Sequence, residues 1–268
     1  MHARLPLFPL ATVLYPGLVL PLHIFEERYR ILVRHLLALP DGVPREFGVV
    51  AIRSGGSGPT NVSGGSGGYA MGGPSAAGTP TTTAVGPIAA SAAKMGPPPG
   101  PLPVSAPITL YEVGCTAQVQ RVTELPDGRF DLVTVGRRRF RIRTLDEKAA
   151  PYLVAEVEWL PEPPGQEQVA DALAPRVLAT FRQYLRLLRA APQDVTEQLP
   201  DDPTVFSHLV AATAALSLAD RQELLAIPDT AARLRAELRM LNREVVLLRH
   251  IRAVPVTIAD LAPPASPN

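Results

Sequence analysis

The chain has only two lysines, Lys94 and Lys148, and they decide whether a serine–lysine hydrolase is possible. Such an enzyme needs a serine nucleophile and a desolvated lysine that acts as its base. Lys94 falls in a tract of small residues and Lys148 in a polar turn, so we expect neither to be desolvated. The sequence also lacks the G-x-x-x-x-G-K-[ST] pattern of a P-loop ATPase. We therefore predict no catalytic residues and no enzymatic activity.

His23, Glu26 and Glu27 form an H-x-x-E-E pattern at an expected helix start. The inverted zinc-protease motif needs a second histidine at the position of Glu27, and acidic residues are favoured near the positive end of any helix. We interpret the pattern as a helix start. The single Cys115 can form neither an intrachain disulfide nor a cysteine-based zinc cluster, and we expect it to be a small apolar strand residue. We expect no metal and no cofactor.

The highest local concentration of charge is a row of four alternating arginines: Arg137, Arg139, Arg141 and Arg143. In a strand these four would share one face, opposite Phe140 and Ile142. Such a face could bind RNA phosphates. However, Glu156 and Glu158 share a face of the next expected strand and could pair with the arginines, and no aromatic residues interleave to stack on bases. We favour a paired, solvated face and keep RNA binding as the alternative.

Residues 5–25 contain no Asp, Glu, Lys or Arg, so they must be buried. About 20 apolar residues can span a bilayer, but this run contains four prolines, which would leave helix carbonyls unsatisfied in lipid. The prolines also interrupt any secretory signal, and no small-x-small cleavage site follows. We therefore predict buried extended segments at 5–8 and 18–22, separated by a Pro16-Gly17 turn.

Further strands are expected on both sides of a tract of unusual composition. Residues 47–52 are apolar and β-branched, and Cys115, Ala117 and Val119 alternate with polar residues. Residues 126–128 form a Pro-Asp-Gly turn. The remaining strands are expected at 129–135, 137–143 and 152–159, as a meander that closes on the amino-terminal strands.

Residues 54–107 consist mainly of Gly, Ser, Ala, Pro and Thr, with Lys94 as their only charge. Such a tract cannot bury enough apolar surface to offset its ordering entropy, so we predict a disordered insertion. Lengthening a loop costs only about 0.6 kcal/mol per doubling, which a barrel can tolerate. We predict a barrel domain over 1–162, a helical bundle over 166–253 and a flexible tail over 254–268.

Helical spacing appears first after Pro21, in the apolar set Phe25, Tyr29, Leu32, Val33 and Leu36. It returns at Gln166 and continues to residue 253. Asp202-Pro203, Ser217, and Asp229 or Thr230 are expected helix starts. The last helix carries a 4-3-4-3 apolar seam typical of a bundle: Leu234, Leu238, Leu241, Val245 and Leu248.

Four stretches carry a resemblance to a known family: LPLFPLATVLYPGLVLPLHIFEERYR (5–30), GCTAQVQRVTELPDGRFDLVTVGRRRFRI (114–142), PYLVAEVEWL (151–160) and LLAIPDTAARLRAEL (224–238). They resemble the amino-terminal, substrate-binding domain of Lon-type ATP-dependent proteases. The resemblance implies an α+β fold, a small PUA-like β-barrel followed by a helical bundle. The ATPase and protease motifs of that family are missing from this sequence.

The resemblance implies a non-catalytic module that recognises unfolded or exposed polypeptide, as an adaptor or regulator of protein quality control in the bacterial cytoplasm. A protease partner is possible under this hypothesis. Pockets often form where domains meet, so we expect the contact surface at the junction of barrel and bundle, with Tyr15, Phe25 and Tyr29 as candidates. A net charge of +1 gives no general bias toward nucleic acid or membranes. An independent peptidase, the third hypothesis, predicts cleavage of casein.

Overall fold

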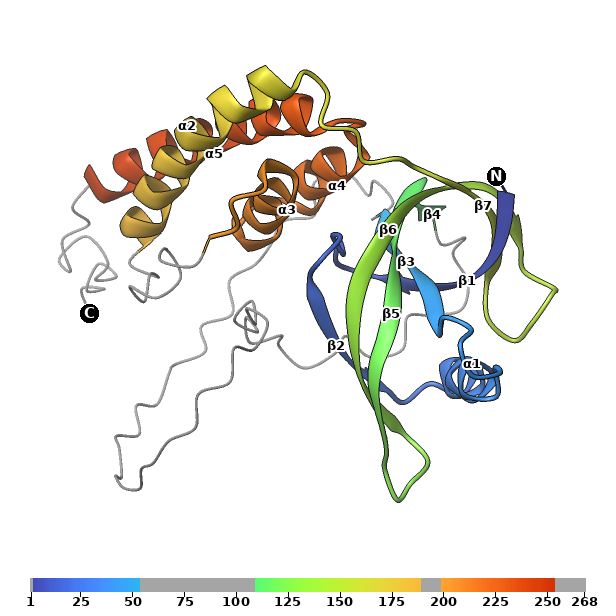
Figure 1. The fold of residues 1–268 in the computed structure, drawn as a ribbon. Helices are drawn as coiled ribbons and strands as arrows, with labels where there is room; N and C mark the ends of the chain where they lie inside the picture. Colours follow the sequence, from blue (N-terminus) through green and yellow to red (C-terminus); the bar gives the residue numbers. More distant parts are fainter. Residues whose placement is uncertain (1, 54–108, 189–198, 254–268) are drawn as a thin grey trace, which may run out of the picture. The chain divides into compact units, whose positions relative to one another are not determined.

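The computed structural model describes residues 2–53, 109–188 and 199–253 (Figure 1). Within these ranges, strands and one helix lie between His2 and Trp159, and four helices follow from Glu167. This arrangement confirms the predicted α+β class. The predicted insertion at 54–107 and the predicted tail at 254–268 lie outside the described residues.

The described strands form one sheet that closes on itself. It consists of β1 (His2–Leu10), β2 (Val19–Ile24), β3 (Glu46–Arg53), β4 (Thr109–Leu110), β5 (Val113–Glu124), β6 (Phe130–Asp146) and β7 (Val154–Trp159). The strands pair in the order β1-β7-β6-β5-β3-β4, and β1 also pairs with β3 in parallel. The β1–β3 pairing closes a ring, so the predicted barrel is confirmed. β2 lies on β6, outside this ring.

Two glycines allow the chain to turn from β1 into β2. Gly17 has φ of +79°, as the predicted Pro16-Gly17 turn requires. At Gly136 of β6, an added Cβ would lie 2.1 Å from the backbone oxygen of Tyr15. Gly17 N–H donates to the oxygen of Gly136 at 2.9 Å, and Gly136 N–H donates to the oxygen of Leu18 at 2.8 Å. The close approach of these backbones fixes the start of β2 on β6.

Helix α1 (Glu27–Leu37) packs against the barrel through its apolar face. Its buried residues are Tyr29, Leu32, Val33 and Leu36, as the spacing predicted. The Tyr29 ring stacks on Phe8 with centroids 4.0 Å apart. The expectation that Phe25 belongs to this face is wrong, because Glu26 is still extended and the helix begins at Glu27. Phe25 therefore precedes the helix and is 50% exposed.

The other helices are α2 (Glu167–Leu188), α3 (Pro203–Thr213), α4 (Leu218–Ala226) and α5 (Thr230–Ala253). Three of them begin at the predicted caps. Asp202 accepts from the backbone N–H of Thr204 and Val205, with Pro203 in the first turn. Ser217 accepts from Asp220 N–H, and Asp229 accepts from Ala232 N–H at 2.8 Å.

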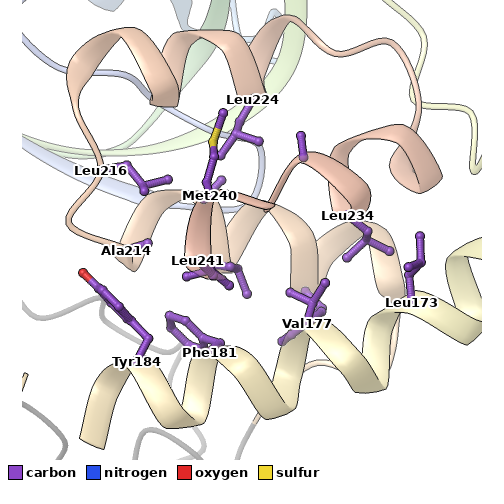
Figure 2. Packing of buried hydrophobic residues seen from close by; sticks show 14 of the residues in the cluster. Leu173, Val177, Phe181, Tyr184, Ala214, Leu216, Leu224, Leu234, Met240 and Leu241 are labelled. Atoms are coloured by element: carbon purple, nitrogen blue, oxygen red, sulfur yellow. The ribbon is translucent and has the colours of Figure 1, made fainter. Parts of the chain in front are cut away.

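Helices α2 and α5 lie side by side and form the centre of the helical core (Figure 1). Leu173, Val177 and Phe181 of α2 face Leu234 and Leu241 of α5 (Figure 2). The predicted seam of α5 is thus confirmed as an internal packing surface. Its members Leu234, Leu241 and Val245 are buried, while Leu238 and Leu248 are partly buried and pack against the same cluster.

Candidate functional site

Exposed apolar side chains gather on the outside of β2 and β6. The pairs Val19–Val135 and Pro21–Val133 lie opposite each other across the two strands. Paired residues point to the same side of a sheet, and Pro21 and Val133 are exposed while Val19 and Val135 are partly exposed. Phe25 is odd-numbered like Val19 and Pro21, so it points to the same side and continues this line beyond the end of β2. We call these five residues the β2 strip.

A polar group separates Phe25 from the rest of the β2 strip. His23 lies opposite Asp131, with Nδ1 and Oδ1 2.6 Å apart, and Arg129 Nη1 lies 3.1 Å from His23 Nε2. An arginine can only donate, so His23 accepts at Nε2 and donates from Nδ1 to Asp131. The Phe25 ring stacks on the imidazole with centroids 6.4 Å apart. The group therefore orients Phe25 on the outside of the sheet.

The backbone of β2 has an unpaired edge among the described strands, because β2 pairs there only with β6. Gly136 N–H and the Thr134 hydroxyl donate to the oxygens of Leu18 and Leu20, so the even-numbered residues of β2 face β6. By alternation, Val19 and His23 direct N–H and C=O toward the open edge, whereas Pro21 directs only a C=O. A proline at such a position limits edge-to-edge pairing without preventing it.

The structure does not bring the three predicted contact residues together on one surface. Tyr15 lies at the junction of barrel and helices, where it is 0% exposed and its hydroxyl donates to the oxygen of Arg221 at 2.7 Å. Burial raises the pKa of Tyr15. Tyr29 is buried under α1, and burial raises its pKa to about 12. Of the three, only Phe25 presents its ring to solvent.

The junction is held by Arg139, and the prediction that four alternating arginines share one solvated face is wrong. A β-bulge shifts the β5–β6 register between Cys115 and Ala117, and Arg139 points inward, 0% exposed. Its Nε donates to Glu162, and its Nη atoms donate to four backbone oxygens: Leu225 (2.7 Å), Ile227 (2.5 Å), Pro161 (2.9 Å) and Pro228 (3.2 Å). All five N–H donors of the guanidinium are therefore used. They tie β6 to the segment before α2 and to the end of α4 with the residues that follow it.

The other arginines of the row are dispersed. Arg137 is exposed and donates to Gln118 at 2.5 Å, and Arg141 is partly buried. Arg143 pairs with Glu158 of β7, so one of the predicted cross-strand ion pairs is confirmed. The sequence reasoning also passed over Arg138, which pairs with Glu46 and lies 3.9 Å from the Trp159 ring centroid. These side chains do not form a continuous cationic face.

Sequence reasoning also missed a buried polar cluster formed by Glu162, Ser207, His208, Arg233 and Glu237. Arg233 Nε donates to Ser207 at 2.8 Å, and Ser207 donates to Glu237 at 2.7 Å. His208 Nε2 and Arg233 Nη2 lie 3.4 and 3.6 Å from Glu162 Oε2. A signal was present, since Arg233 and Glu237 are spaced i, i+4 among the core residues of α5.

Burial sets the charge states of this cluster. It raises the pKa of Glu237 to about 8, against smaller opposing effects of Ser207 and Arg233. It also lowers the pKa of His208, with help from Arg233 and against the attraction of Glu162. For Glu162, burial favours the neutral acid, but the nearby His208, Arg139 and Arg233 together lower the pKa below its ordinary value. Near neutral pH, Glu162 is therefore the anion that compensates the buried arginines.

The remaining candidates for chemistry lie apart. Cys115 is fully buried, and burial raises the pKa of its thiol. Lys148 is exposed, while Lys94 lies outside the described residues. Within 2–53, 109–188 and 199–253, no group of three or more His, Cys, Asp or Glu could hold a metal ion. No helix in the described ranges is both long and apolar enough to cross a bilayer.

Comparison with known proteins gives a match over most of the chain. The family described as "ATP-dependent protease La (LON) substrate-binding domain" matches residues 4–243. Lon protease of Escherichia coli (strain K12) is 30% identical over 142 residues, which are 52% of this chain and 18% of that protein. Lon protease 1 of Thermus thermophilus is 34% identical over 145 residues, again 52% of this chain and 18% of that protein. The chain thus spans less than a fifth of these relatives.

Solved structures share the fold. The N-terminal domain of the Mycobacterium avium complex Lon protease superposes with a TM-score of 0.56 and 16% identity, covering 90% of this chain and 98% of that chain. The Lon N-terminal domain protein from Xanthomonas campestris gives a TM-score of 0.50 with 21% identity, covering 88% and 98%. The resemblance predicted from the four sequence stretches, and the fold that it implied, are confirmed.

Proposed function

Because the chain belongs to the family of LON substrate-binding domains, we propose that it binds exposed apolar segments of unfolded polypeptide on the β2 strip, without catalysing a reaction. The observation that carries the proposal is the combination of Phe25 and Val133 with the open edge of β2. An extended segment can add to a sheet edge through main-chain hydrogen bonds while its side chains contact the neighbouring surface. Pro21 leaves two residues, Val19 and His23, to donate along that edge.

The surroundings of the β2 strip favour a loose, sequence-tolerant interaction. The apolar residues are small or flat, and the edge offers backbone groups that any extended segment can use. Few N–H donors and a small apolar area indicate modest affinity, as expected for a protein that releases its clients. The proposal places the chain as an adaptor or regulator of protein quality control in the bacterial cytoplasm, with a protease as one possible partner.

The test measures binding of a permanently unfolded polypeptide, fluorescein-labelled reduced and carboxymethylated α-lactalbumin, by anisotropy. The double variant Phe25→Ser/Val133→Ser should bind about thirtyfold more weakly, because the two side chains together lose about 2 kcal/mol of apolar contact. Leu37→Ser/Val43→Ser is the matched control, since these residues are similarly exposed at 37% and 45%. Equal loss in both variants, or in neither, would contradict the proposal.

The same experiment separates the other hypotheses. Displacement of the polypeptide by single-stranded RNA, reversed by salt and by Arg137→Gln/Arg143→Gln, would favour the RNA-binding alternative. Fragmentation of the labelled polypeptide by the purified chain would favour a peptidase. If the chain has the proposed function, the polypeptide is recovered intact and RNA does not displace it.

A further inference from the structure

Helix α5 carries a second regular stripe on its solvent side. Its residues follow the 4-3-4-3 spacing of one helix face: Arg235, Arg239, Asn242, Val246 and Arg249. All five are exposed. Each of them directly follows a residue of the seam that packs on α2, so the stripe lies about 100° around the helix from the seam. Its exposure shows that the internal packing of the bundle does not use it. We call this set the α5 stripe.

The α5 stripe combines unpaired positive charge with one exposed apolar residue, Val246. Among the described residues, no ion pair or hydrogen bond engages the side chains of Arg235, Arg239 or Arg249, and the stripe contains no acidic residue. The nearby Arg243 differs, because it pairs with Asp220 at 2.8 Å and with Glu244 at 3.0 Å. Val246, in the carboxyl-terminal half of the stripe, is 50% exposed. Arginine side chains beside exposed apolar area are typical of protein-binding surfaces.

We propose that the α5 stripe docks an acidic helical segment of a protein partner. Guanidinium groups pair with carboxylates in a planar, two-bond geometry, which favours Glu or Asp opposite the three arginines. A helix that repeats its contacts at 4-3-4-3 intervals fits beside a stripe with the same spacing. The apolar residue of the partner then lies against Val246. This inference does not depend on the β2 strip and concerns a different face of the chain.

Other occupants fit the α5 stripe less well. A second copy of the same stripe would place arginines against arginines, which is repulsive. Single-stranded nucleic acid is usually held by aromatic stacking, and the stripe has no aromatic residue. A helix that lies in a membrane surface inserts a broad apolar face, whereas the broad apolar face of α5 is buried against α2.

The test uses the full chain and a synthetic, fluorescein-labelled amphipathic peptide with Glu at the heptad positions flanking a line of Leu. The peptide should bind by anisotropy, and more weakly as salt increases. Arg235→Gln/Arg239→Gln/Arg249→Gln should lower its affinity about tenfold, the sum expected of three exposed ion pairs. The control Arg121→Gln/Arg176→Gln/Arg186→Gln removes the same charge from exposed sites elsewhere and should bind as the unmodified chain does. Far-ultraviolet circular dichroism checks that both variants are folded.

Three results would overturn the inference. One is equal binding by the two triple variants, which would indicate general charge attraction. The second is equal binding of a peptide with every Leu replaced by Gln, which would leave Val246 without a role. The third is failure of the peptide to bind at low salt. If a single-stranded RNA or a phosphatidylserine vesicle then binds the unmodified chain and binds the α5 triple variant more weakly, the stripe serves that other partner.

Discussion

Replacing Arg139 by alanine should destabilise the protein more than replacing Arg137, Arg141 or Arg143, the other predicted arginines of the row on β6. The substitution removes five donors at once and leaves four carbonyl oxygens without their partner. Glu162 loses its direct partner and keeps only the more distant His208 and Arg233. Removing one member of a buried, hydrogen-bonded ion pair costs about 3–5 kcal/mol. With a urea slope of about 2–3 kcal/mol per molar, the unfolding midpoint should fall by about 1–2 M. Arg139→Lys keeps the charge but offers at most three donors, so its unfolding midpoint should lie between those of the unmodified chain and Arg139→Ala.

Urea unfolding can be followed by fluorescence of Trp159, the only tryptophan. Trp159 ends β7 next to the contacts of Arg139, because Leu160 N–H donates to the Arg139 oxygen at 3.0 Å. Arg137→Ala is the control, since Arg137 is exposed, and it should cost less than about 1 kcal/mol. Equal midpoints for Arg139→Ala and Arg137→Ala would refute the conclusion that Arg139 holds the junction.

Three further predictions concern Glu237, Cys115 and Asp202. The pKa of Glu237 rises from 4.5 to about 8 on folding, so between these pH values the folded chain retains a proton that the unfolded chain releases. The free energy of unfolding should therefore fall as pH rises through this window, by at most about 1.4 kcal/mol per pH unit. The test compares the urea midpoints of the unmodified chain and Glu237→Gln between pH 6.5 and 8, a range that avoids the opposite effect of His208 at lower pH. If the midpoints of the two proteins changed with pH in parallel, the prediction would be contradicted. Buried Cys115 should react with Ellman's reagent only on unfolding, whereas labelling of the native chain at the rate of a free thiol would show that the strand is open. Asp202→Ala should cost about 1 kcal/mol through loss of the α3 cap, with the neighbouring Asp201→Ala as a neutral control in the same denaturation assay.

Local signals in the sequence predicted most of the fold. The caps at Asp202 and Ser217 and the seam of α5 depend on a few neighbouring residues, and the structure has them where the sequence indicated. The turn at Gly17 is local in the same sense. The barrel followed from strand alternation and from the resemblance of four stretches to one family. Its closure through parallel β1–β3 pairing is a long-range feature that alternation alone does not specify.

The site was harder to predict because it depends on register and on where elements end. Strict alternation predicted one face for the arginine row, but the bulge near Cys115 turned Arg139 inward. Helical spacing placed Phe25 in the core, yet α1 begins two residues later and leaves its ring exposed. The i, i+4 spacing of Arg233 and Glu237 was a local signal of a buried pair, but their partners Ser207 and Glu162 lie on other elements and do not follow from the pattern of α5.

The most direct test of polypeptide binding on the β2 strip is amide hydrogen exchange with and without saturating reduced, carboxymethylated α-lactalbumin. Exchange at Val19 and His23, whose N–H groups face the open edge, should slow on binding, while exchange in α5 should not change. Unchanged exchange across residues 18–25 at saturation, or protection confined to another surface, would contradict the account.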